Sequence, residues 1–128
     1  MKGFKASASF CGYTVNKASI NQRDDKTVCD FVLGVGGWKT RGVPGVYIKC
    51  HVWGKSARKV ARAITEGGLA CEVTGRLTQS SRVVNGLAYI NNDLVLNKLR
   101  VQDGVGSLSL SEIVIQSEKR REAPRSED

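Results

Sequence analysis

One segment of ten residues combines aromatic and basic side chains at a spacing that suits a flat, negatively charged ligand. Residues 46–55 read Val-Tyr-Ile-Lys-Cys-His-Val-Trp-Gly-Lys. Side chains alternate along a β-strand, so every second residue of this segment shares one face. The face expected to be exposed carries Tyr47, Lys49, His51 and Trp53. Aromatic rings stack on bases and cations attract phosphates, so single-stranded nucleic acid is a fitting ligand.

The segments on either side of this strand add further candidate binding residues. A glycine-rich loop precedes it and holds Trp38, Lys39 and Arg41. An aromatic ring among basic residues in such a loop is better suited to binding than to filling a core. Arg76 lies in a later strand, and Arg82 follows that strand closely. The five residues extend the candidate set of aromatic and cationic groups.

Plainer roles remain open for several of these side chains. Trp53 could instead fill a core or a subunit interface, and Tyr47 could lie at the rim of a site. Arg76 could be a solvated strand residue, and His51 could make a local hydrogen bond. Which role applies depends on the fold that positions them.

The pattern of apolar residues predicts five strands and one helix. The expected strands are residues 4–11, 27–35, 46–53, 69–78 and 87–99. Between the third and fourth strands, a narrow apolar stripe at i, i+3, i+4 and i+7 indicates a helix with Ser56 as its cap. The stripe consists of Ala57, Val60, Ala61 and Ile64. This order predicts an all-β fold, a five-stranded Greek-key barrel of the OB type.

Glycines and polar residues mark the expected connections. Gly12 is expected to interrupt the first strand as a bulge or sharp bend, and residues 16–26 read as a polar loop. Asn85 and Gly86 predict a tight hairpin turn. Residues 108–116 alternate and then slip in phase, which predicts an extra C-terminal strand with a bulge.

The length of 128 residues suits one domain, and its net charge of +8 favours polyanionic partners. Nucleic acid comes first among these and acidic membrane surfaces second, while a solvated basic surface without a partner is the plainer alternative. Residues 117–128 hold four basic and four acidic side chains, so the excess positive charge belongs to residues 1–116. We expect a binding domain over 1–116 and a disordered charged tail over 117–128.

The cysteines and the lone histidine argue against a metal site or an enzyme. Cys11, Cys29, Cys50 and Cys71 form no C-x-x-C pair, and His51 has no acidic residue close to it in sequence. We expect no cofactor, no metal and no catalysis, and four reduced core thiols in a cytoplasmic protein, with a disulfide or two as the alternative. Signal-peptide and membrane-length apolar runs are not apparent.

Three segments together resemble the bacterial single-stranded DNA-binding proteins. They are residues 27–35 (Thr-Val-Cys-Asp-Phe-Val-Leu-Gly-Val), 46–55 (quoted above) and 66–77 (Glu-Gly-Gly-Leu-Ala-Cys-Glu-Val-Thr-Gly-Arg-Leu). The resemblance runs from about Ala8 to Val101. It implies stacking by Trp38, Tyr47 and Trp53. From their positive charge, we expect the basic residues of the site to contact phosphates; these are Lys39, Arg41, Lys49, Arg76 and Arg82.

The chain departs from that family in several places. The position of a fourth stacking aromatic falls near Arg82, where an arginine can stack or bind phosphate instead. The C-terminus reads Ala-Pro-Arg-Ser-Glu-Asp and lacks the Phe of the family's acidic Pro-Phe tip, which leaves recruitment of replication and repair proteins open. The helix has a basic outer face. A divergent phage or mobile-element member, or a specialised paralogue, fits these departures.

The favoured hypothesis is sequence-independent binding and protection of single-stranded DNA during replication, recombination or repair. By resemblance, the protein would be a homo-oligomer, with a tetramer favoured over a dimer, in the bacterial nucleoid or a phage-infected cell. The alternative is a primosome-type or RNA-binding OB-fold adaptor. A third hypothesis, a structural interaction domain, would use the exposed aromatics to hold a protein partner.

Overall fold

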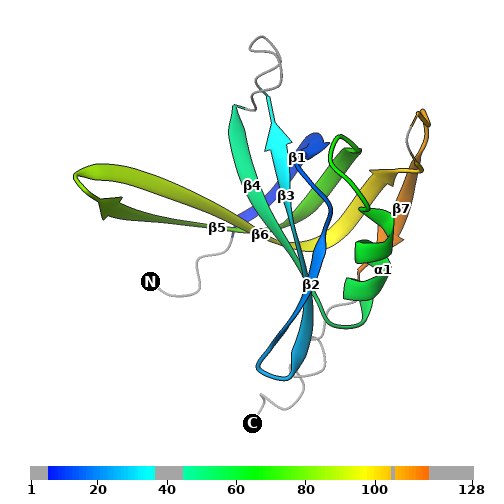
Figure 1. Ribbon diagram of the computed structural model, residues 1–128, viewed down its shortest axis with the longest axis horizontal. Coiled ribbons are helices and arrows are strands. Elements are labelled where there is room, and N and C mark those ends of the chain that lie inside the picture. Colours follow the sequence, from blue (N-terminus) through cyan, green and yellow to red (C-terminus); the bar gives the residue numbers. More distant parts are fainter. Residues whose placement is uncertain (1–5, 37–44, 105, 116–128) are drawn as a thin grey trace.

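Seven strands and one short helix make up the computed structural model, which describes residues 6–36, 45–104 and 106–115 (Figure 1). The strands are β1 (Ala6–Thr14), β2 (Ser19–Arg23), β3 (Lys26–Val35), β4 (Val46–Trp53), β5 (Ala70–Val84), β6 (Leu87–Gln102) and β7 (Leu110–Val114). A 3-10 turn, η1 (Gly54–Ser56), and the helix α1 (Ala57–Ala63) connect β4 to β5. In the described part of the chain, no helix is long and apolar enough to span a membrane.

Five of the strands close into a barrel. The order along the sheet is β1-β5-β6-β4-β3, and β1 also pairs with β3, which completes the ring. The β4–β6 pair is parallel and the other pairs are antiparallel. With the helix between the third and fourth strands of the ring, this arrangement is the predicted OB-fold barrel.

β1 runs through Gly12 to Thr14 rather than ending at the glycine. Gly12 and Tyr13 still pair with β5, and from Tyr13 onward β1 also pairs with β3, where Tyr13 lies opposite Gly34. A Cβ atom at Gly12 would collide with the carbonyl oxygen of Gly34. The glycine therefore permits a close crossing of two strands, and the expected interruption of the first strand is wrong.

A bulge in the β5–β6 pair shifts the inward phase of β6 between Leu96 and Leu99. Thr74 pairs with Lys98 but Gly75 pairs with Leu96, so one residue of β6 is left without a partner. The inward face of β6 consequently changes phase. The buried residues on either side of the bulge are Leu94, Leu96, Leu99 and Val101.

α1 closes one end of the core with Ala57 and Val60, and Ile64 directly after the helix adds to it; all three are completely buried. Ser56 occupies the N-cap position, as predicted, but its dihedral angles are helical and its side chain makes no capping hydrogen bond. Its hydroxyl instead donates to the carbonyl oxygen of Val114, 3.4 Å away, and links the helix start to β7. The C-terminal strand is present, but it pairs with β6 in regular register, without the expected bulge.

All four cysteines are free, but only three of them belong to the core. Burial raises the pKa of Cys29 and of Cys71 to about 12, and burial also raises the pKa of Cys50. Cys11 is exposed, because it shares the outward phase of β1 with Ser7 and Ser9. The expectation of four core thiols is therefore wrong for Cys11.

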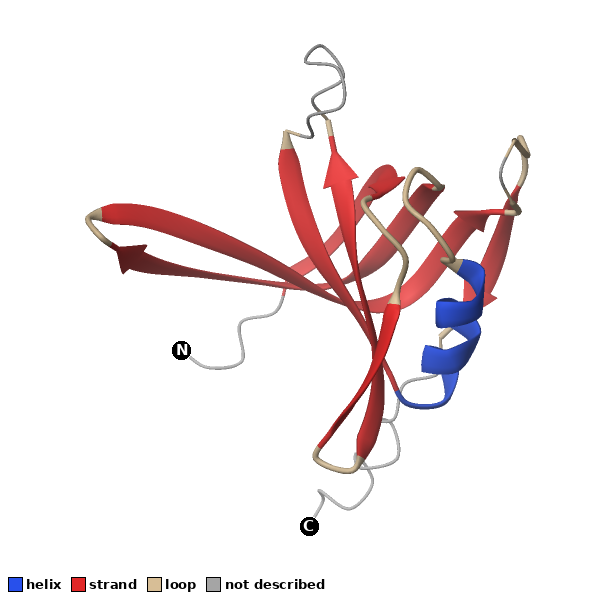
Figure 2. Cartoon of the chain, in the orientation of Figure 1, coloured by secondary structure: helices blue, strands red, loops and turns tan. Residues whose placement is uncertain are grey.

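Two predicted connections are partly strand. β2 forms within residues 16–26 and pairs with β3 through a two-residue turn in which Asp24 and Asp25 have φ of 50° and 64°. β5 extends to Val84 and leaves only Asn85 and Gly86 as the predicted tight turn before β6. The result is a long hairpin that projects from the barrel (Figure 2). We call residues 78–93 of this hairpin the arm.

Candidate nucleic-acid interface

The outward face of β4 carries the four side chains that the alternation predicted. Tyr47 is 54% exposed and Lys49 is exposed, whereas His51 and Trp53 are half-buried. The intervening apolar side chains of β4 point into the barrel and are buried. The core therefore fixes which face of β4 is presented to solvent.

Trp53 lies at the end of β4, where the chain turns. It pairs directly with Val28 of β3, which is completely buried and lies on the same outer face of the sheet. Gly54 follows with φ of 85°, a conformation that favours glycine. These neighbours leave Trp53 half-buried, with part of the residue open to solvent.

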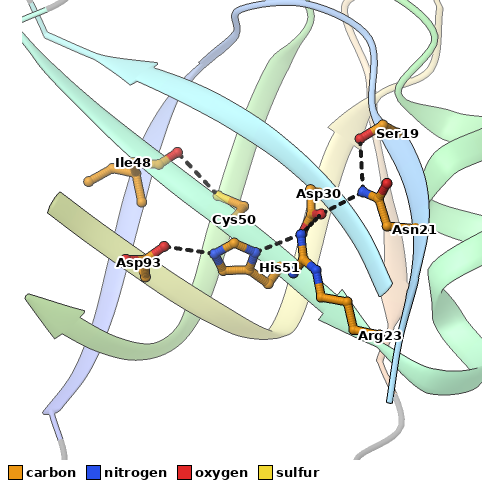
Figure 3. A network of polar contacts seen from close by, with 8 residues as sticks. All are labelled: Ser19, Asn21, Arg23, Asp30, Ile48, Cys50, His51 and Asp93. Atoms are coloured by element: carbon orange, nitrogen blue, oxygen red, sulfur yellow. Dashed lines mark hydrogen bonds and ion pairs between the residues drawn. The ribbon is translucent and has the colours of Figure 1, made fainter. Parts of the chain in front are cut away.

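His51 is held by carboxylates on both sides (Figure 3). Its Nδ1 lies 2.7 Å from Oδ1 of Asp30 on β3, and its Nε2 lies 2.8 Å from Oδ1 of Asp93 on β6. Oδ2 of Asp30 also accepts hydrogen bonds from Asn21 Nδ2 at 2.8 Å and from Arg23 Nη2 at 3.0 Å. The network joins four strands across the outer face.

This network gives His51 a structural role, as the local hydrogen-bond alternative allowed. The acidic partners come from residues 21 and 42 positions away in sequence, so inspection of its neighbours in sequence could not find them. Each ring nitrogen already has a carboxylate partner.

Lys49 reaches from β4 towards the arm. Its Nζ donates to Oδ1 of Asn91, 3.4 Å away, and the Cα atoms of Lys49 and Asp93 are partners in the parallel β4–β6 pair. Lys49 forms no ion pair with any described residue and its side chain is exposed. It therefore offers a cation between two aromatic residues, Tyr47 and Trp53.

The arm continues the same face with Arg82 and Tyr89, and Arg76 precedes the arm on β5. Directly paired residues lie on one face of a sheet, and Asp93 pairs with Thr78 while Tyr89 pairs with Arg82. By the same alternation, Arg76 shares this face. The guanidinium of Arg82 lies over the Tyr89 ring, 5.9 Å from its centroid. Tyr89 is 45% exposed.

Tyr89 is a candidate that the sequence analysis missed. The Asn85-Gly86 turn could have revealed it from the sequence, because a two-residue turn fixes which residues of a hairpin face each other. Counting outward from that turn places Tyr89 opposite Arg82. The arm thus carries an aromatic ring beside the arginine at which the fourth stacking position was expected to be empty.

The structure therefore brings together most of the predicted candidates. Those that share the outer face are Tyr47, Lys49, Trp53, Arg76 and Arg82. Trp38, Lys39 and Arg41 lie outside the described residues, between β3 and β4. The face also contains Asp30 and Asp93, but both carboxylates are engaged by His51.

Comparisons with known proteins support the fold. No family model matches the chain, and no curated protein is similar enough to match it. Among solved structures, the barrel is similar to the crystal structure of a small single-stranded DNA-binding protein from Streptomyces coelicolor, with a TM-score of 0.57 and 17% sequence identity. The match covers 75% of this chain and 93% of that one. At this identity the similarity shows a shared OB-type fold.

Proposed function

We propose that this protein binds single-stranded DNA without regard to sequence, across the outer face of β4 and the arm. The observation that carries the proposal is the alignment, on one continuous face of an OB barrel, of exposed or half-buried rings with cations that form no ion pair with a described residue. Tyr47 and Trp53 lie on either side of Lys49, and Tyr89 lies beside Arg82. The solved structure with the similar fold is itself named as a single-stranded DNA-binding protein, which supports the proposal.

In the proposed mechanism, aromatic side chains take the bases. Stacking of a base on an aromatic ring contributes about 1–3 kcal/mol and tolerates any base, because every base has a flat face. Tyr47, Trp53 and Tyr89 are the stacking residues of the described face, and Trp38, which lies outside the described residues, is proposed as a fourth. Binding by stacking needs no recognition of base edges, so it carries no sequence preference.

Basic side chains hold the phosphates in the same mechanism. Lys49, Arg76 and Arg82 are the contacts on the described face, and Lys39 and Arg41, which lie outside the described residues, are proposed as further contacts. Each phosphate contact releases condensed counterions, so affinity falls as salt rises. The two kinds of contact give binding one part that is sensitive to salt and one part that persists at high salt.

The proposed role is protection of single strands during replication, recombination or repair, in the bacterial cytoplasm or a phage-infected cell. The proposal includes a homo-oligomer, with a tetramer favoured over a dimer. The first residues of β1 support this part, because residues 6–12 pair with β5 on one edge and with no described strand on the other. That stretch has no charged residue to discourage pairing with a second copy.

A tryptophan-fluorescence titration tests the proposal. Trp38→Phe leaves Trp53 as the sole tryptophan, so the signal reports the face directly. We expect oligo-dT to quench this signal strongly, with part of the quenching surviving high salt, and duplex DNA to have little effect. A weak response that salt abolishes equally for single strands and duplex would overturn the proposal. Tighter binding of oligo-U than of oligo-dT would favour the RNA-binding alternative.

A further inference from the structure

The outer face of β4 and the arm, with Tyr47, Trp53 and Tyr89, is called the aromatic face below. A second basic surface lies beyond its Trp53 end, on η1 and α1. Its four members, which we call the helix row, are Lys55, Arg58, Lys59 and Arg62. They fall at i, i+3, i+4 and i+7, so they share one side of the helical segment. All four are exposed, and the opposite side carries the buried apolar stripe.

The helix row is unfavourable for the helix that carries it. No acidic residue lies in the first turn of α1, where a negative charge would complement the helix dipole, and Arg58 and Lys59 occupy that turn instead. Like charges three and four residues apart also repel one another. None of the four forms an ion pair with a described residue. An external anion would relieve this repulsion.

The helix row begins where the aromatic face ends. Trp53 is the last residue of β4, Gly54 turns the chain, and Lys55 is the first cation of the row. Figure 1 shows α1 on the opposite side of the barrel from the arm. A single strand of nucleic acid that crosses the arm and then β4 would therefore leave the aromatic face at Trp53 and meet the helix row next.

We propose that the helix row binds the phosphates of the single strand beyond Trp53 and so lengthens the site. This inference rests on the proposed function and extends it. Nucleic acid is favoured over an acidic protein because the row continues the aromatic face without a break in the chain. No aromatic residue interrupts residues 54–63, so this part of the site would hold phosphates without stacking bases.

The test compares oligo-dT lengths in the doubly substituted protein Arg58→Gln/Arg62→Gln. Lengths spanning roughly 4–16 nucleotides cover the site sizes known for OB folds. We expect the shortest bound oligomer to keep its affinity, because the aromatic face alone holds it. For the longest oligomers we expect weaker binding, with the salt dependence (the slope of log K against log salt) lowered by about 1.4, or about 0.7 for each lost contact.

Two controls test whether the expected effect depends on the charge of the two side chains and on their place in the helix row. Arg58→Lys/Arg62→Lys keeps both charges and should preserve the salt dependence for long oligomers. Arg100→Gln removes one positive charge from a residue that is bonded to Glu72 and paired with Glu112 on another part of the barrel. This variant should bind all lengths as the parent protein does. Thermal unfolding of each variant confirms that it is folded.

The outcomes distinguish the two proposals. Unchanged affinity and salt dependence for long oligomers in Arg58→Gln/Arg62→Gln would overturn the proposal for the helix row and leave the proposal for the aromatic face intact. An equal loss at every length would also overturn it, since the row would then not be an extension. Failure of every oligomer to quench Trp53 in the Trp38→Phe protein, which is otherwise parental, would instead reject the proposed function itself.

Discussion

The barrel and the arm are built from the same two strands, yet they differ in what surrounds their side chains. Within the barrel, Leu94 and Leu99 of β6 are completely buried. In the arm, Val83 and Ile90 are 71% and 66% exposed. The buried residues of the barrel therefore determine stability, whereas the exposed residues of the arm can change with little effect on stability. Because β5 and β6 run without a break from the barrel into the arm, the barrel can offer a long surface to an extended ligand.

The largest expected effect is on the free energy of unfolding, which should fall for a substitution in the barrel and hardly change for one in the arm. Leu94 and Ile90 lie on the same face of β6, one inside the barrel and the other in the arm. Leu94→Ala should lower the free energy of unfolding by about 2–5 kcal/mol, because it leaves a cavity in the core. Ile90→Ala should change it by about 0.5 kcal/mol or less. Urea unfolding measures both, and equal losses would contradict the comparison.

The next effect concerns binding at the junction of barrel and helix. Trp53→Ala should weaken binding of oligo-dT by about 1–3 kcal/mol through loss of a stacking ring. Trp53→Phe retains a ring and should recover most of the affinity. Fluorescence anisotropy with a labelled oligomer measures this, and circular dichroism checks the fold. A folded Trp53→Ala protein with parental affinity would remove this residue from the site.

A smaller effect tests whether the arm takes part in binding. Tyr89→Leu keeps an apolar side chain but removes the flat ring, and should weaken binding by about 1 kcal/mol, the lower end of the stacking range. Ile90→Ala is the matched control, because Ile90 is adjacent in sequence but faces the other side of the hairpin. Equal affinities of the two variants for oligo-dT would exclude the outer face of the arm from the site.

The smallest effect is a change in salt dependence. Lys49→Gln should lower the slope of log K against log salt by about 0.7, the value for one phosphate contact to a single strand. Lys49→Arg keeps the charge and should retain the slope. Titrations at several salt concentrations measure it. An unaltered slope in Lys49→Gln would mean that the ammonium group serves only to hold Asn91 of the arm.

The sequence predicted the barrel well because its strands alternate strongly. It failed for β2, because Ser19, Asn21 and Gln22 are polar and exposed, and Ile20 is the strand's one half-buried residue. That strand exists because β3 offers it an edge, which is a tertiary effect. Gly12 was read as a break for a related reason, since only the neighbouring Gly34 shows why a side chain cannot fit there.

For the site, periodicity within one strand was predictable and pairing between strands was not. The exposed face of β4 followed from alternation alone. The carboxylates that hold His51 come from β3 and β6, and no local pattern links these strands. Tyr89 lay between these extremes, since the Asn85-Gly86 turn fixes its partner once the strands are known to reach the turn.

The contrast between Cys11 and the three buried thiols has a practical consequence for chemical labelling. Burial raises the pKa of Cys29 and Cys71 to about 12 and also raises that of Cys50, so these groups form little reactive thiolate near neutral pH. Of the four cysteines, Cys11 is the exposed one. A maleimide dye should therefore attach to the native protein at a single position on β1. No cysteine would have to be introduced or removed to report on that edge of the barrel.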